Sequence, residues 1–191
     1  GKIDWAVVEV CDILAGGGVV LTSSIGAAPT YLSHAEKIIL ELNSAHPATL
    51  LGLHDILELQ DPPCRREIPI YSASDRVGSP ICLLDPKKIV AVVLNNQPDE
   101  TGGFDPSTPE TDQIGQNVAD FLASEMKAGR IPKSFLPLQS GVGNIANAVL
   151  AAIGKSKEIP TFQMYTEVLQ DSVIPLIEAG RCSFASTTAL T

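Results

Sequence analysis

Positive charge is scarce in this sequence. Thirteen lysines and arginines face 22 aspartates and glutamates, which gives a formal net charge of −9. A protein that follows a phosphate backbone needs clustered basic side chains, and this sequence contains no basic tract of that kind. We therefore expect no nucleic acid among its partners.

Long apolar runs are also lacking. No stretch reaches the ~20 residues that a helix needs to span a bilayer, and the opening GKIDWAVVEV does not have the pattern of a signal peptide. The composition, 45% apolar and 18% charged, is typical of a soluble globular protein rather than a disordered one. We expect no membrane partner.

Cysteines are few, and they are not arranged as ligands. The sequence has no CxxC pair and no histidine at metal-ligand spacing from a cysteine. We expect no metal site and reduced, structural thiols in an intracellular protein, either cytoplasmic or, in a eukaryote, mitochondrial. The four cysteines are Cys11, Cys64, Cys82 and Cys182.

The sequence does contain many short apolar runs separated by small-residue turns. Rich in β-branched residues and leucine, these runs predict strands covered on both faces, as in a mostly parallel α/β sheet. Residues 26–36 predict a short helix, and the proline-rich stretch 45–80 predicts a long excursion over the surface. In the first half the strand-like runs are 5–10, 19–24, 37–43 and 87–95.

Residues 95–110 have the composition of a domain linker, since turn formers dominate and apolar residues are almost absent. Ser107 and Glu110 have capping-box spacing, and Pro109 falls in the first turn of the helix that would follow. An apolar stripe continues from there to Gly129, which predicts one long amphipathic helix.

The second part alternates strand-like and helix-like segments. This β-α-β-α-β order predicts right-handed parallel crossovers, and Gly154 and Gly180 are predicted C-terminal caps. The fold class is therefore α/β, with open, mostly parallel sheets and flanking helices. The predicted strands are 134–140, 161–169 and 181–187, and the predicted helices are 144–154 and 171–180.

The turn from Gly141 to Asn144 leads from a predicted strand straight into a helix, where ligands of such sheets gather. Backbone N–H groups and the helix dipole at this corner attract an anion or a developing oxyanion. Gly141 and Gly143 would let a ligand approach the backbone closely. The spacing fits a tight turn without a ligand equally well.

A dinucleotide site is an alternative interpretation of the same stretch. Gly141, Gly143 and Ala146 satisfy the relaxed G-x-G-x-x-G/A pattern, and Glu167 follows roughly where a ribose-binding acid would fall. Against this alternative, Glu167 lies within an apolar strand rather than at its end. Spacing alone leaves a nicotinamide enzyme open.

Glu167 is itself a candidate functional acid. Strand alternation places it on one face with Tyr165 and Leu169, where a carboxylate would be partly desolvated and would need a partner. The alternation also allows a simpler interpretation, in which Glu167 points to solvent from a half-buried edge.

Several motifs carry a family resemblance. The stretch LPLQSGVGNIANAVL (136–150), followed by YTEVLQD (165–171) and IEAG (177–180), closely resembles the acetyl-CoA hydrolase/transferase family, which includes class I CoA-transferases such as succinyl-CoA:acetate and 4-hydroxybutyrate CoA-transferases. Upstream segments resemble the same family in the same order, so that the resemblance covers essentially the whole chain. These segments are GLHDI (52–56), SDRVG (74–78), DPKKIVAVV (85–93) and KAGRIPKSFLPLQSGVG (127–143).

The resemblance implies a fragment that joins two partial CoA-transferase domains. Residues 1–105 would be the C-terminal part of the first domain, and residues 106–191 the N-terminal part of the second. Glu167 is then the catalytic nucleophile. A CoA-contacting segment, whose backbone contributes to an oxyanion hole, would consist of Gly141, Val142, Gly143, Asn144 and Ile145.

The activity implied by the resemblance is transfer of CoA between a short-chain acyl-CoA, of the acetyl- or succinyl-CoA type, and a carboxylate such as acetate. The transfer would pass through a glutamyl-CoA thioester and carry side acetyl-CoA hydrolase activity. CoA would be a substrate rather than a tightly bound cofactor, and the enzyme would be a homodimer. The alternatives are a nicotinamide-dinucleotide-binding oxidoreductase domain and a non-catalytic structural fragment.

Overall fold

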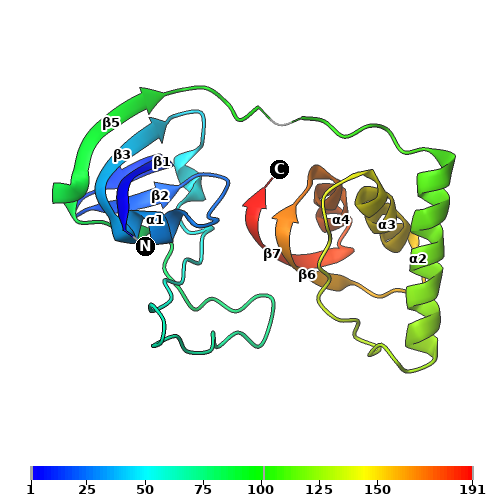
Figure 1. Cartoon of the computed structure of the whole chain (residues 1–191). Coiled ribbons are helices and arrows are strands. Elements are labelled where there is room, and N and C mark those ends of the chain that lie inside the picture. Colours follow the sequence, from blue (N-terminus) through cyan, green and yellow to red (C-terminus); the bar gives the residue numbers. More distant parts are fainter. Residues whose placement is uncertain (1, 101, 191) are drawn as a thin grey trace. The chain divides into compact units, whose positions relative to one another are not determined.

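The computed structural model describes residues 2–100 and 102–190, which form two compact units (Figure 1). Residues 2–71 and 75–100 make up the first unit, and residues 102–190 make up most of the second. Among the described residues, no helix combines the length and the apolar character required to cross a membrane.

The first unit is built on a five-stranded sheet of order β4-β2-β1-β3-β5. Strand β1 pairs in parallel with β3, and β3 with β5, whereas β2 is antiparallel to both β1 and β4. One short helix, α1 (Ala28–His34), precedes β3. The strands are β1 (Ile3–Leu14), β2 (Gly18–Leu21), β3 (Ala35–Asn43), β4 (Cys82–Leu83) and β5 (Ile89–Asn95).

A glycine turn makes the sheet of the first unit mixed. Gly16 and Gly17 both have positive φ, 84° and 90°, which is the signature of the tight turns that join antiparallel strands. The turn therefore folds β2 back onto β1 as a hairpin. The expected α/β fold is present, and among the described residues three of the five strand pairs are parallel.

Burial differs along the sheet of the first unit, because all four residues of β2 are buried whereas β1 and β3 are buried mainly on one face. Val10, Leu21 and Ile38 are fully buried, whereas Trp5 and Val7 on β1 are 52% and 65% exposed. Strand β5 is exposed along most of its length. The expectation that these strands are covered on both faces therefore holds for β2 and is wrong for β1, β3 and β5.

The proline-rich segment 45–80 is the predicted surface excursion. Apart from the 3₁₀ turn η1 (Ala48–Leu50), its order comes from an antiparallel bridge between Ile56 and Ser79. Asp55 reinforces the bridge, since its carboxylate accepts hydrogen bonds from the N–H groups of Val77 and Gly78. A second 3₁₀ turn, η2 (Pro86–Lys88), leads into β5.

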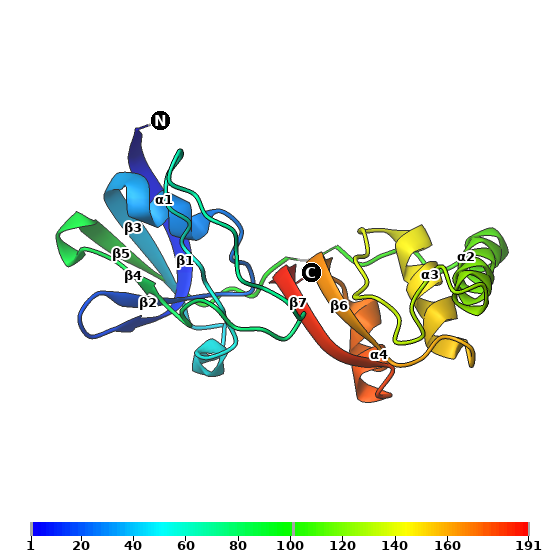
Figure 2. The same cartoon turned by 90° about the horizontal axis from the view of Figure 1, so that it is seen from below.

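The second unit is layered. Strands β6 and β7 form a parallel sheet, α3 and α4 lie against one side of it, and α2 packs on the far side of α3 (Figures 1 and 2). The helices and the sheet enclose a hydrophobic core. The elements are α2 (Pro109–Lys127), α3 (Asn144–Lys155), β6 (Phe162–Leu169), η3 (Asp171–Val173), α4 (Ile174–Glu178) and β7 (Cys182–Leu190).

The predicted strand 134–140 is not a strand. Only Leu138 pairs with β6: its N–H donates to the carbonyl of Gln163 over 2.8 Å, and its own carbonyl accepts from the N–H of Tyr165. Pro137 has no N–H to donate to a ladder, and Phe135 has a φ of 56°. These two residues limit the pairing to a single bridge.

Two predicted helix signals need correction. The N-cap of α2 is Thr108 rather than Ser107, because it directly precedes Pro109 at the first helical position; Thr108 and Thr111 form the capping box. Gly154 lies inside α3, where a β-carbon would collide with Leu176. The cap after α4 is as predicted, since Gly180 has a φ of 66°.

Two contacts hold the helices of the second unit in place. A β-carbon on Gly115 of α2 would lie 2.5 Å from the carbonyl oxygen of Ala148 in α3, so glycine allows the two backbones to touch. Arg181 follows α4, and its guanidinium donates hydrogen bonds to carbonyl oxygens in the last turn of α3 and just after it. These belong to Ile153, Gly154, Ser156 and Ile159.

Candidate active site

The glycine loop directly precedes α3 in the second unit. Gly143 is the N-cap of the helix, with a φ of 126° that favours glycine. Asn144 begins the helix and is partly buried, as is Gly143, whereas Gly141 is exposed. The side chains of Val142 and Ile145 are 58% and 53% exposed. The loop therefore offers open backbone at the N-terminus of a 12-residue helix.

Two buried polar side chains tie this loop to β6. Thr166 is 6% exposed, and its hydroxyl oxygen accepts a hydrogen bond from the N–H of Ser140. Gln170, 1% exposed, follows the end of β6. Its side-chain amide donates to the carbonyl of Gly141 over 2.8 Å and accepts from the N–H of Gly143 over 3.2 Å.

Glu167 lies on β6 between these two tethers, and it is exposed. Its neighbours on the strand differ, because Tyr165 is 49% exposed and Leu169 is buried. The helices cover the other face of β6, which carries Met164 and Thr166. The expected partial desolvation of Glu167 is therefore absent among the described residues, and the solvent-facing interpretation holds for this chain.

The structure brings the predicted loop, Gly141 to Ile145, next to the strand that carries Glu167. It also identifies two residues that the sequence analysis did not single out, Thr166 and Gln170. Both lie in or beside the YTEVLQD segment, and a signal was available: a threonine and a glutamine at positions that an apolar strand buries need partners. Their partners are backbone atoms, which leave no pattern in the sequence.

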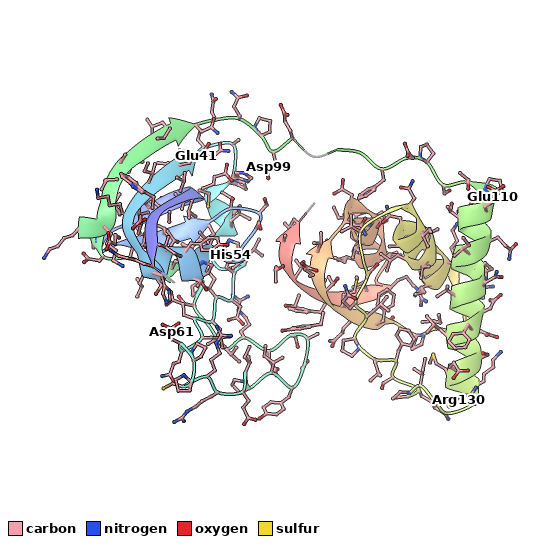
Figure 3. All side chains as sticks on the ribbon, in the orientation of Figure 1. Glu41, His54, Asp61, Asp99, Glu110 and Arg130 are labelled. Atoms are coloured by element: carbon pink, nitrogen blue, oxygen red, sulfur yellow. The ribbon has the colours of Figure 1, made fainter. Side chains whose placement is uncertain are left out.

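A second polar cluster lies in the first unit. The carboxylate of Glu9 accepts hydrogen bonds from Thr22 and Asn43, and His46 Nε2 lies 3.6 Å from Glu9 and 3.4 Å from Asp99. One ligand atom each of Glu9, His46 and Asp99 lies within 4.8 Å of the others. Figure 3 labels Asp99 at the end of the segment that follows β5.

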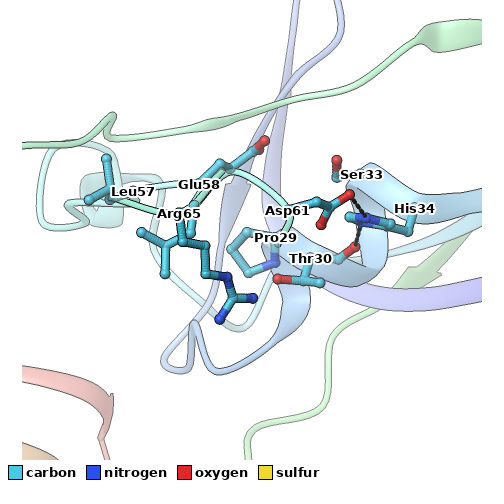
Figure 4. A pocket seen from close by; sticks show the side chains of 9 residues that line it. Pro29, Thr30, Ser33, His34, Leu57, Glu58, Asp61 and Arg65 are labelled. Atoms are coloured by element: carbon cyan, nitrogen blue, oxygen red, sulfur yellow. Dashed lines mark hydrogen bonds and ion pairs between the residues drawn. The ribbon is translucent and has the colours of Figure 1, made fainter. Parts of the chain in front are cut away.

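A small cavity lies beside α1, lined by residues of that helix and of the segment 57–65 (Figure 4). Its volume of about 120 Å³ is well below the roughly 300–1,000 Å³ of ordinary ligand pockets. At its edge His34 bonds to Asp61 over 3.1 Å, and this hydrogen bond raises the pKa of the imidazole. The cavity is too small for a CoA-sized ligand.

The four cysteines are free. Burial raises the pKa of Cys82 to about 11. Burial is also the main reason that the pKa values of Cys11 and Cys182 are raised. Thiols of this kind are poor nucleophiles at neutral pH. Cys64 is exposed on the excursion of the first unit, away from the glycine loop in sequence. Three of the four therefore behave as core residues, as expected.

The chain is similar in sequence to known proteins. Residues 1–94 match the family model of the acetyl-CoA hydrolase/transferase N-terminal domain. The chain is 51% identical over 191 residues to propanoyl-CoA:succinate CoA transferase of Escherichia coli (strain K12), covering 100% of this chain and 39% of that relative. It is 40% identical over 187 residues to acetyl-CoA hydrolase of Schizosaccharomyces pombe, covering 98% of this chain and 36% of that relative.

A solved structure, 4-hydroxybutyrate CoA-transferase from Porphyromonas gingivalis, resembles the chain with a TM-score of 0.62 at 19% identity, covering 98% of this chain and 39% of that one. The fold is thus a CoA-transferase fold of the α/β class. With the sequence matches, it follows that the chain belongs to the acetyl-CoA hydrolase/transferase family. The chain spans about two fifths of the length of the curated relatives it matches.

Proposed function

We propose that this chain carries the catalytic glutamate of an enzyme that moves CoA between a short-chain acyl-CoA and a carboxylate such as acetate. Glu167 is the nucleophile, and Gly141 to Ile145 contact the CoA thioester. The observation that carries the proposal is the set of hydrogen bonds that holds the glycine loop against β6 on both sides of Glu167. The names of the two curated relatives support the same chemistry.

The first half of the reaction needs only a carboxylate. An oxygen of Glu167 attacks the thioester carbonyl carbon, the carbon–sulfur bond breaks, and a mixed anhydride and CoA thiolate result. The thiolate then attacks the carbonyl carbon of Glu167, a carbon–oxygen bond breaks, and the donor acid leaves as a carboxylate. CoA remains on Glu167 as a thioester, and no net proton transfer is required.

The acceptor acid completes the exchange. Its carboxylate attacks the glutamyl thioester to give a new mixed anhydride and CoA thiolate, and the thiolate attacks the acyl carbon of the acceptor. Glu167 is released unchanged. Water in place of the acceptor would hydrolyse the glutamyl thioester, which accounts for hydrolase activity on the same residues. The S. pombe relative, named acetyl-CoA hydrolase, supports this second activity.

Each addition places negative charge on a carbonyl oxygen, and the loop offers a donor for it. The N–H of Gly143 is engaged by Gln170, so Val142 rather than Gly143 supplies the N–H of the oxyanion hole. One preorganised donor of this kind is worth ~3 kcal/mol in the transition state. The dipole of α3 acts in the same direction.

The remaining features of the proposal rest on the family resemblance. Residues 1–105 and 106–191 belong to the first and second CoA-transferase domains, CoA and acyl-CoA act as substrates without a tightly bound cofactor, and the enzyme works as a homodimer in the cytoplasm or, in a eukaryote, in mitochondria. A sedimentation measurement on the full-length protein tests the dimer.

The two alternatives make different predictions. A nicotinamide enzyme would place its ribose-binding acid at the end of a strand, whereas Glu167 lies two residues before the end of β6 at Leu169. Thermal protection by NAD but not by CoA would favour that alternative. A non-catalytic fragment would bind neither and would turn over no acyl-CoA.

The covalent step can be tested directly. The protein at the full length of its relatives is incubated with acetyl-CoA without acceptor, treated with borohydride or hydroxylamine, digested and mapped by mass spectrometry. We expect the modification on Glu167, and none in Glu167→Gln. A modification at another residue, or exchange activity retained in Glu167→Gln, would contradict the mechanism.

A further inference from the structure

Gln170 is buried to 99% of its surface, and both polar atoms of its side chain are committed to the glycine loop. The orientation of the amide is fixed by its partners, because the carbonyl of Gly141 can only accept and the N–H of Gly143 can only donate. Gln170 thus bridges the two peptide groups that flank Val142.

This bridge fixes the direction of the Val142 N–H. In a trans peptide the carbonyl oxygen and the following N–H point in opposite directions. Because the Gly141 carbonyl is held toward Gln170, the Val142 N–H of the same peptide points away from Gln170. The next peptide is reversed, since its N–H, that of Gly143, points inward to Gln170. Without the bridge, two glycines leave the loop free to rotate these peptides.

Glu167 and Gln170 share one short segment. Gln170 comes three residues after Glu167 and directly follows β6, while Thr166, on the other side of Glu167, holds Ser140. The nucleophile and the orientation of the loop are therefore set by the same five residues of chain, 166–170. A shift of the segment would move both together.

We propose that Gln170 is a positioning residue, which orients the peptide between Gly141 and Val142 so that its N–H meets the oxyanion formed when Glu167 attacks a thioester. This inference rests on the proposed function, and it goes further because it assigns a role to a side chain that touches neither substrate nor Glu167. Oxyanion stabilisation acts mainly in the transition state, so its loss lowers kcat more than it raises KM.

Three variants of the full-length protein test the role. Gln170→Met keeps a similar volume and removes both hydrogen bonds. Gln170→Glu keeps the acceptor for Gly143 but faces the Gly141 carbonyl with a carboxylate oxygen. Ser172→Ala is the matched control, because it removes a nearby part-buried hydrogen bond, to Asn147, that does not involve the glycine loop.

We expect Gln170→Met to lower kcat about 10²-fold, with a change in the KM for acyl-CoA of less than about threefold, and to slow glutamyl-CoA formation by the same factor. Ser172→Ala should keep kcat within about twofold. In Gln170→Glu, kcat relative to wild type should rise as the pH falls, since the protonated carboxyl can again donate to Gly141. This recovery of kcat at low pH distinguishes a role in orienting the loop peptide from a role in packing alone. The measurement on Gln170→Glu remains informative even if Gln170→Met folds poorly.

The inference fails if Gln170→Met keeps the wild-type kcat, if Ser172→Ala lowers kcat equally, or if the relative kcat of Gln170→Glu does not change with pH. In each of these cases a Glu167→Gln variant that has lost both turnover and the covalent adduct leaves the proposed function intact. Retained turnover in Glu167→Gln would instead overturn the proposed function, whatever Gln170 does.

Discussion

The two units use their buried polar side chains in different ways. In the first unit Thr22 and Asn43, 4% and 1% exposed, both donate to the carboxylate of Glu9, over 2.8 and 2.7 Å. In the second unit Thr166 and Gln170, 6% and 1% exposed, bind backbone atoms of a loop instead. Within the part of the chain that the structure describes, each unit thus has two such residues and a glutamate near them.

The difference lies in what happens to the glutamate. Both carboxylate oxygens of Glu9 accept hydrogen bonds, one from Thr22 just after β2 and one from Asn43 at the end of β3. A carboxylate whose oxygens are engaged in this way is a poor nucleophile. Glu167 is exposed, and its strand contributes hydrogen bonds to the loop rather than to the carboxylate. A buried polar pair therefore binds the acid itself in the first unit, whereas in the second it binds the loop beside the acid that we propose as the nucleophile.

The largest expected effect comes from a matched pair of substitutions, Glu9→Ala and Glu167→Ala, in the full-length protein. Glu167→Ala should lower acyl-CoA:carboxylate exchange by about 10³-fold or more, because it removes the nucleophile. Its unfolding midpoint should stay close to wild type. Glu9→Ala should cost roughly 1–3 kcal/mol of stability, since the donors of Thr22 and Asn43 lose their acceptor.

Exchange assays and denaturant titrations on both variants measure the two effects. Loss of activity in Glu9→Ala at temperatures where it is folded would break the comparison, and so would a destabilised Glu167→Ala. In either case the two glutamates could no longer be assigned one structural and one catalytic role.

Much of the fold follows from local sequence signals. The hydrophobic periodicity of 114–126 and the glycines that end segments predict α2 and the cap after α4. The strand prediction fails at 134–140, where Pro137 and Phe135 interrupt pairing. The antiparallel pairing of β2 in the first unit was not predicted, because the turn at Gly16 decides it and apolar runs look alike in parallel and antiparallel sheets.

The site was predictable in part. The loop and Glu167 came from motifs, but the sequence could not pair Gln170 with Gly141 and Gly143, which lie 29 and 27 residues away. The sequence left the exposure of Glu167 open for a related reason. Alternation specifies which residues share a face, whereas the covering of that face depends on other segments of the chain.

A substitution of Arg181 tests whether the stability of the second unit depends on the hydrogen bonds of a polar side chain, as we expect for Glu9 in the first unit. Arg181→Met removes donors to four carbonyl oxygens at and beyond the end of α3, and it should lower the free energy of unfolding by about 3 kcal/mol. Urea denaturation measures this change. As a control, Arg130→Met breaks an ion pair with Glu125 in which the arginine is exposed, and this should cost less than ~1 kcal/mol. Equal losses would argue against the role of Arg181.

Gly115 extends the comparison to helix packing, since it lies where α2 and α3 of the second unit meet, whereas the described part of the first unit has α1 as its one α-helix. In Gly115→Ala the new β-carbon would meet the carbonyl of Ala148, so α2 and α3 must move apart. We expect a net loss of about 1–2 kcal/mol, despite the better helix propensity of alanine. Gly103→Ala, with open space around the new methyl group, is the control. A stabilised Gly115→Ala would show that the two helices are not in contact there.

The smallest effect concerns the cysteines, which report on the two units separately. In the folded protein a thiol reagent at neutral pH should modify Cys64 alone, because the other three are buried and have raised pKa values. As urea increases, Cys11 and Cys82 should become reactive together, since both belong to the core of the first unit or border it, while Cys182 follows the second unit. Mass spectrometry of each labelled peptide gives the two midpoints. A single shared midpoint would mean that the units unfold as one, and the contrast between their polar networks would then describe one cooperative structure rather than two.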